Sequence, residues 1–149
     1  MKLLFLDVDG VLNTDDTRMI HGWDHICPDR VKLIASIVNQ TGCEIILSST
    51  WRQNPTDKIM VEAALSECNL KIKDYTPIFF RKPRWMEINH FLEENPSWER
   101  AAVLDDDEEA HNVNKMDPFV EFFHTNYEHG ITQDIHNRII EWFNSPFIK

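Results

Sequence analysis

The sequence has few of the features that mark exported or membrane-bound proteins. Its three cysteines, Cys27, Cys43 and Cys68, are odd in number and show no Cys-x-x-Cys spacing. They predict reduced thiols in a cytoplasmic protein, and they argue against a disulfide framework or a zinc site. No apolar run approaches the ~20 residues that span a bilayer. The short apolar run at the N-terminus reaches Asp7 and Asp9 too soon for a secretory signal, so we expect no membrane association.

Positive charge is also scarce. The chain has 15 Lys and Arg residues against 25 Asp and Glu residues, a formal net charge of −10. Non-specific binding to nucleic acid requires lysines and arginines that displace counterions from phosphates, so we do not expect it, although a local basic pocket remains compatible with this charge. No repeat, low-complexity tract or linker divides the 149 residues, of which 42% are hydrophobic. The composition therefore predicts a single domain over residues 1–149 with a substantial core.

Short apolar runs alternate with segments of helical periodicity along the whole chain. We expect strands at 3–6, 44–47, 101–104 and 120–123, with a less regular strand within 70–80. Helices are expected from Pro28 to Gly42, from Pro55 onward, around 85–92 and after Thr132, whereas residues 14–27 predict a loop. In the second helix, Ile59, Ala63 and Ala64 have the spacing of an apolar face. This alternation predicts an α/β fold in three layers around a central parallel sheet.

The first strand ends in two acidic residues, Asp7 and Asp9, which are followed directly by Gly10. Two neighbouring carboxylates repel each other and lose hydration when they are partly buried, so such a pair does not favour stability. A Mg²⁺ ion removes this conflict, because it is a hard cation that binds carboxylates and substrate phosphate. Gly10 allows a sharp turn that brings backbone groups close to a ligand. The segment therefore predicts a metal-assisted phosphate site.

Three further polar clusters follow apolar runs or precede a helix. They are Ser48-Ser49, Arg81-Lys82-Pro83-Arg84 and Asp105-Asp106-Asp107. Ligands of parallel α/β sheets bind at the carboxyl ends of the strands, where these clusters fall. In order and chemical type, the four clusters resemble the four motifs of the haloacid dehalogenase (HAD) superfamily of aspartate-nucleophile phosphatases. The segment Asp7-Val-Asp9-Gly10-Val11-Leu12 carries most of this resemblance, which covers most of the chain.

The resemblance implies a Rossmann-like HAD fold and a catalytic role for four residues. Asp7 would attack phosphorus and form an aspartyl-phosphate, while Asp9 would act as general acid and then as general base. Ser48 would hydrogen-bond a phosphate oxygen, and Lys82 would neutralise the transferring phosphoryl group. An acid/base at position 9 favours a phosphatase over a dehalogenase.

The same resemblance assigns the cofactor and the substrate contacts. Mg²⁺ would be bound by Asp7, by the backbone carbonyl of Asp9, and by Asp105 or Asp106. The remaining substrate-binding candidates are Gly10, Ser49 and Arg84, of which Arg84 is also the alternative to Lys82 as the phosphate-contacting base.

A narrower resemblance concerns the substrate. The segments Leu47-Ser48-Ser49-Thr50-Trp51-Arg52, His124-Thr125 and Gly130-Ile131-Thr132 look like the small HAD domains of RNA-repair proteins, similar to the phosphatase half of polynucleotide kinase-phosphatases. The segments after the first two motifs are too short for a substantial cap domain, so an open site is expected. The candidate substrates are nucleotides and phosphorylated nucleic-acid ends. Two alternatives remain, namely a catalytically weak binding or regulatory module and a phosphotransferase to an acceptor other than water.

Overall fold

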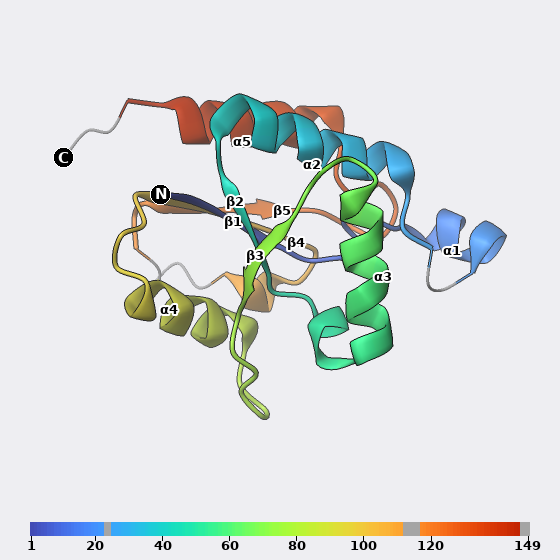
Figure 1. Ribbon diagram of the computed structural model, residues 1–149, viewed down its shortest axis with the longest axis horizontal. Helices are drawn as coiled ribbons and strands as arrows, with labels where there is room; N and C mark the ends of the chain where they lie inside the picture. The colour runs from blue at the N-terminus through green and yellow to red at the C-terminus, as the bar shows by residue number, and fades with distance from the viewer. Residues whose placement is uncertain (23–24, 112–116, 147–149) are drawn as a thin grey trace.

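The computed structural model describes residues 1–22, 25–111 and 117–146, and it has a central five-stranded sheet in which every neighbouring pair of strands is parallel (Figure 1). The strand order is β3-β2-β1-β4-β5. The strands are β1 (Lys2–Leu6), β2 (Glu44–Leu47), β3 (Ile72–Tyr75), β4 (Arg100–Asp105) and β5 (Val120–His124). The predicted α/β architecture is confirmed, and each predicted strand is present to within a few residues.

Helices cover both faces of the sheet and complete the three layers (Figure 1). They are α1 (Asp15–His21), α2 (Pro28–Thr41), α3 (Pro55–Ser66), α4 (Arg84–Glu94) and α5 (Gln133–Asn144), with short 3₁₀ turns η1 (Thr50–Gln53) and η2 (Glu108–Ala110). One core cluster joins alternate strand residues to α2, α3 and α5, and the second joins the opposite set to α4. Successive side chains of a strand point to opposite faces, so a buried strand needs apolar residues at every position.

The helix boundaries follow from local sequence. Pro28 occupies the first turn of α2, and Gly42 ends it with a left-handed φ of 73°. At α5, the Thr132 hydroxyl accepts a hydrogen bond from the Ile135 amide at 3.2 Å and so caps the helix expected after Thr132. Asn54 caps α3 in the same way, accepting hydrogen bonds from the amides of Thr56 and Asp57.

The expectation of a loop over residues 14–27 was wrong in part, because residues 15–21 form α1; residues 23 and 24 lie outside the described part of the chain. This helix buries none of its residues and has no apolar face. Its acidic residues lie in the first turn and its basic residues in the last, an order that the helix dipole favours. Hydrophobic periodicity therefore could not reveal it.

The predicted apolar face of α3 was also wrong. Val61 and Leu65 are fully buried in the core, whereas Ile59 is 64% exposed. Apolar residues occur on several sides of this short helix, so two faces have helical spacing. The face that contains Val61 and Leu65 packs into the core against the sheet, and the predicted face with Ile59, Ala63 and Ala64 does not. None of the helices within the described ranges is long and apolar enough to cross a bilayer.

Candidate active site

The hydrogen-bond ladders of the sheet continue past the strand ends and bring the first polar residues together. The Asp7 amide donates to the Leu104 carbonyl at 3.1 Å, and the Ser48 amide donates to the Leu6 carbonyl at 3.0 Å. Since Leu6 pairs with both Leu47 and Leu104, Asp7, Ser48 and Asp105 occupy neighbouring positions on three adjacent strands. Parallel pairing thus places the predicted motifs side by side.

Three carboxylates gather at this edge of the sheet. Asp7, Asp105 and Asp106 each offer an oxygen atom, and these oxygens all lie within 4.8 Å of one another. Asp7 and Asp105 are buried, with 3% and 0% of their surface exposed. Burial, the charge of Asp105 and contacts with Asp106 raise the pKa of Asp7 well above its ordinary value, although Arg84 opposes this. Burial likewise raises the pKa of Asp105, against the opposing charge of Arg84.

This cluster fits the predicted metal. Hard oxygen donors in close array are the ligands that Mg²⁺ prefers, and a divalent cation would stabilise the charged form of the carboxylates, which burial disfavours. Asp9 contributes no side-chain oxygen to the cluster. Coordination through its backbone carbonyl stays a prediction.

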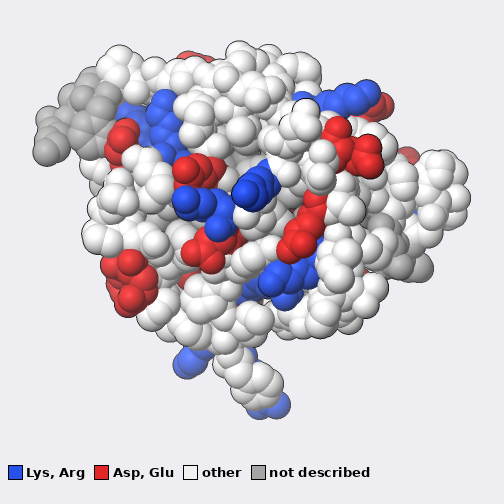
Figure 2. Space-filling view, viewed as in Figure 1, with Lys and Arg blue, Asp and Glu red and all other residues white. Residues whose placement is uncertain are grey.

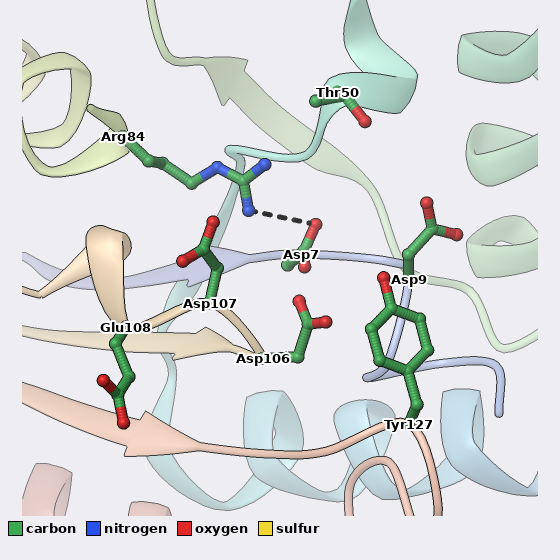
Figure 3. Close-up of a pocket in the computed structure, with 8 residues that line it drawn as sticks. All are labelled: Asp7, Asp9, Thr50, Arg84, Asp106, Asp107, Glu108 and Tyr127. Carbon is green, nitrogen blue, oxygen red and sulfur yellow. Dashed lines mark ion pairs between the residues drawn. The ribbon is translucent and has the colours of Figure 1, made fainter. Parts of the chain in front are cut away.

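Arg84 is the cation closest to the predicted nucleophile. Its Nη1 lies 3.4 Å from Asp7 Oδ1 (Figure 3). The same Nη1 lies 2.6 Å from Asp105 Oδ2. Burial alone would lower the pKa of the guanidinium, but the two carboxylates outweigh it and raise that pKa. The other Asp105 oxygen accepts the Asp107 amide at 2.9 Å. Both oxygens of Asp105 are therefore engaged, whereas Asp106 lines the pocket.

Lys82 does not occupy the place that the sequence analysis gave it. It is exposed on the turn before α4 and does not line the pocket, whereas Arg84, the alternative, does. The physical reason lies in the position of the helix start. Pro83 has an extended ψ of 152° at the N-cap, and Arg84 is the first residue of α4. The helix thereby directs Arg84 toward Asp7 (Figure 3).

The Asp9 carboxylate is held by three donors from separate segments. Arg18 Nη2 lies 2.8 Å from Asp9 Oδ1, and Trp51 Nε1 and Asn13 Nδ2 each donate to the same oxygen at 3.0 Å. Asp9 itself lines the pocket together with Asp7. No role was predicted for Asn13 or Arg18, and Trp51 was named only within a segment that carries the resemblance to RNA-repair domains. The sequence held one weak signal of this arrangement, the polar residue Asn13 four positions after Asp9.

Position 10 requires glycine, because its backbone lies close to the Asp106 side chain. Its φ is +73°, and a Cβ there would lie 2.8 Å from the Asp106 side chain. Its carbonyl accepts a 2.7 Å hydrogen bond from the buried Thr125 hydroxyl, and its amide donates to Asn13 Oδ1 at 3.0 Å. The turn that carries Asp9 is thus tied to the segment after β5.

The two serines differ in their surroundings. Ser49 Oγ, the hydroxyl predicted to bind substrate, accepts a hydrogen bond from the Trp51 amide at 3.1 Å. It thereby caps η1. Ser48 is fully buried, and its hydroxyl has no hydrogen-bond partner among the described residues. An unpaired buried hydroxyl costs about 1–3 kcal/mol. Ser48 does not line the pocket, so a hydrogen bond from its hydroxyl to a phosphate oxygen stays a prediction.

Arg52 connects the segments that surround these residues. Its buried guanidinium forms a 3.0 Å ion pair with Glu87, one turn after Arg84, and donates to the carbonyls of Ser48 and Ser49. It also donates to the carbonyls that follow β3. Burial lowers the pKa of Arg52, and the charge of Glu87 opposes this shift. The pair therefore fixes the serine segment relative to the start of α4.

These groups surround an open, polar pocket of about 550 Å³. It is lined by Asp7, Asp9, Thr50, Arg84, Asp106, Asp107, Glu108 and Tyr127 (Figure 3). Within the described ranges no inserted domain covers it, in agreement with the predicted lack of a cap. Tyr127, another residue that sequence reasoning missed, follows β5. Burial and the nearby charges of Asp106 and Asp9 raise the pKa of its hydroxyl.

Comparison with known families agrees with this geometry. A family model described as the HAD domain in Swiss Army Knife RNA repair proteins matches residues 3–135. The chain belongs to this HAD family. Searches of curated proteins and of solved structures gave no match. The matched range of the HAD domain contains all four polar clusters and ends within α5.

Proposed function

We propose that this HAD domain is a Mg²⁺-dependent phosphomonoester hydrolase that acts through an aspartyl-phosphate on Asp7. The observation that carries the proposal is the carboxylate cluster of buried Asp7 and Asp105 with half-buried Asp106, which lies beside Arg84 and opens into the same pocket as Asp9. Carboxylates held this close favour a divalent cation, and the guanidinium on Asp7 favours a phosphoryl group at the same place.

The chain's own residues divide the reaction between them. An Asp7 oxygen attacks phosphorus, the bond to the ester oxygen breaks, and Arg84 contacts the phosphoryl oxygens as charge redistributes. The Ser48 hydroxyl donates to one of these oxygens, which satisfies its missing hydrogen bond. Asp7 and Asp106 would hold Mg²⁺, which supplies charge neutralisation at the phosphoryl group. Asp105 keeps Arg84 in place through the 2.6 Å contact.

We assign the proton transfer to Asp9, which lines the pocket together with Asp7. Arg18, Trp51 and Asn13 all contact Oδ1, which leaves Oδ2 to carry the transferred proton. Asp9 would give a proton to the leaving oxygen and then take one from the water that attacks the phosphorus of the aspartyl-phosphate. That second attack releases phosphate and regenerates the Asp7 carboxylate.

We expect the substrate to be the phosphorylated end of a nucleic acid, with free nucleotides as the second candidate. The open pocket supports this proposal, because no inserted domain covers it in the described part of the chain. The family description, which refers to RNA repair, favours RNA ends over small metabolites.

A substrate panel tests this function. Purified protein with Mg²⁺ should release phosphate from a generic aryl phosphate and from 3′- or 5′-phosphorylated oligoribonucleotides. The rate should fall at least about tenfold when EDTA removes the metal, and it should return when Mg²⁺ is restored. Absence of phosphate release from every substrate would refute the hydrolase proposal. Mg²⁺-dependent binding without turnover would then favour a regulatory module, and transfer of the phosphoryl group to an added alcohol would favour a phosphotransferase.

Replacing Trp51 with phenylalanine should slow turnover about tenfold with little change in KM. The substitution removes the indole N–H that donates to Asp9 Oδ1 at 3.0 Å and retains most of the aromatic packing. One hydrogen bond of about 1.4 kcal/mol corresponds to a tenfold change in rate. Steady-state kinetics with an aryl phosphate measures the effect. Trp98→Phe, in the opposite core cluster, is the matched control and should keep the wild-type rate.

A further inference from the structure

The segment between β3 and α4 projects away from the body of the domain (Figure 1). We call residues 77–82 the projecting loop. Two of its apolar side chains face solvent, with Phe80 83% exposed and Ile78 55% exposed. Arg81 and Lys82 follow Phe80 and are also exposed. Figure 2 shows Lys and Arg atoms at the end of the projection.

The loop is anchored at its base. Arg52 Nη2 donates to the Pro77 carbonyl at 3.0 Å, and the Phe79 amide donates to Glu87 Oε2 at 2.8 Å. The same Arg52–Glu87 ion pair that supports the pocket therefore also supports the loop. At the tip, the Lys82 amide donates to the Phe79 carbonyl at 3.3 Å. These contacts fix the conformation of the loop, in which the Phe80 side chain is exposed to solvent.

The loop also lies close to the pocket along the chain. Arg84 follows Arg81 by three residues and contacts Asp7. Consecutive Cα atoms are 3.8 Å apart, so the Cα atoms of Arg81 and Arg84 are separated by at most about 11 Å. The projecting loop therefore ends close to the cation that contacts Asp7, where the nucleotides next to a phosphate at Asp7 can reach it.

The chemistry of the loop selects one class of partner. The Arg81 guanidinium lies 5.1 Å from the centroid of the Phe80 ring, so an aromatic face and a cation are presented together. A flat exposed ring binds a base by stacking, and adjacent cations bind backbone phosphates. Arg81 and Lys82 are exposed cations on a protein whose net charge is −10 and whose pocket is lined by five carboxylates. The two cations of the loop attract a polyanion locally, on a molecule whose net charge is negative.

We propose that the projecting loop binds the single-stranded nucleotides next to the phosphorylated end, with Phe80 stacked on a base and Arg81 paired with a backbone phosphate. This inference rests on the proposed function, and it assigns a subsite for the part of the substrate that does not react. Binding energy from such a subsite lowers KM for a long substrate and leaves the chemistry at Asp7 unchanged.

The test compares Phe80→Ala with the wild type on two substrates. For a 3′-phosphorylated single-stranded oligoribonucleotide, KM should rise about 5- to 100-fold with kcat nearly unchanged. For the aryl phosphate, which has no neighbouring nucleotide, both constants should stay within about twofold. Phe80→Trp should restore the oligonucleotide KM, whereas Phe80→Leu should not, because only an aromatic face stacks on a base.

A control and a second variant separate stacking from other effects. Ile59→Ala removes another exposed apolar side chain, on α3, and should leave both substrates unchanged. Arg81→Gln should raise the oligonucleotide KM and reduce the slope of log KM against log salt concentration by about one.

Several outcomes would overturn the inference. An equal effect of Phe80→Ala on both substrates would make Phe80 a structural residue, and no effect on either would exclude the stacking. A change in sedimentation with unchanged kinetics would show that the loop is a contact between protein copies. Failure of the proposed function is distinguishable, because the wild-type protein itself would then leave the oligonucleotide intact, and the loop proposal would fall with it.

Discussion

Asp7→Asn should lower phosphate release about 10⁴-fold or more while the protein remains folded. Asparagine keeps the size of the side chain but cannot form the acyl-phosphate, and loss of a covalent nucleophile removes the main route of catalysis. Single-turnover assays with an aryl phosphate and Mg²⁺ would measure the loss. Glu109→Gln removes one negative charge from the exposed segment after β4, outside the pocket lining, and should retain the wild-type rate.

Although Asp7→Asn should abolish activity, we expect it to increase the stability of the metal-free protein. Burial raises the pKa of Asp7 above its ordinary value of 3.8, so the metal-free protein loses stability as the pH rises through that elevated pKa. Asparagine has no charge to bury. We therefore expect Asp7→Asn to unfold at a temperature about 2–4 °C higher than the wild type at pH 7, and at nearly the same temperature below pH 3.8.

Thermal unfolding followed by circular dichroism, without metal and then with Mg²⁺, checks this difference. Added Mg²⁺ should stabilise the wild type more than the variant, because the wild type gains a ligand for its carboxylate. A variant that unfolds at a lower temperature at pH 7 would contradict the buried-charge argument. Near-wild-type turnover would show that Asp7 is not the nucleophile.

Arg84→Met should reduce kcat about 100- to 1,000-fold, whereas Lys82→Met should change it less than about threefold. Arg84 contacts Asp7 at 3.4 Å and Asp105 at 2.6 Å, and it lines the pocket. Lys82 is exposed on the preceding turn. The two substitutions are chemically matched, since each replaces a long cationic side chain with an uncharged one of similar length.

Arg84→Met should also be less stable than Lys82→Met. Removing Arg84 leaves Asp105, which is fully buried, without its cationic partner, and breaking a buried pair in this way costs about 3–5 kcal/mol. Urea unfolding of the metal-free proteins measures the difference, and Lys82→Met should unfold like the wild type. The reverse order, with Lys82→Met the slower enzyme, would restore the original assignment of Lys82 as the phosphate-contacting base.

Sequence periodicity was sufficient to predict the sheet and most of its helices, because buried parallel strands need continuous apolar runs. Leu3–Leu6 and Ala101–Leu104 are such runs, and each ends at the acidic residues of the site. The resemblance to the HAD motifs then implied that Asp7 shares a metal site with Asp105 or Asp106, and the parallel pairing of β1 with β4 places Asp7 beside Asp105.

Side-chain direction at the site could not be predicted in the same way. The choice between Lys82 and Arg84 depends on where α4 begins, and that depends on the turn at Arg81, whose φ is 55°. The support for Asp9 comes from Trp51, 42 residues away, and from Arg18 on a helix without an apolar face. Such contacts depend on tertiary packing and leave no periodic signal.

The close approach of Gly10 to Asp106 has a consequence for how the domain folds. The two residues belong to segments separated by almost a hundred positions, and they meet only when β4 lies against β1. Contacts between such distant segments form late, because the loss of chain entropy on closing the intervening loop must be met first. The carboxylates that repel one another therefore come together only when β4 pairs with β1. We therefore expect the reactive centre to form in the same step as the pairing of β1 with β4.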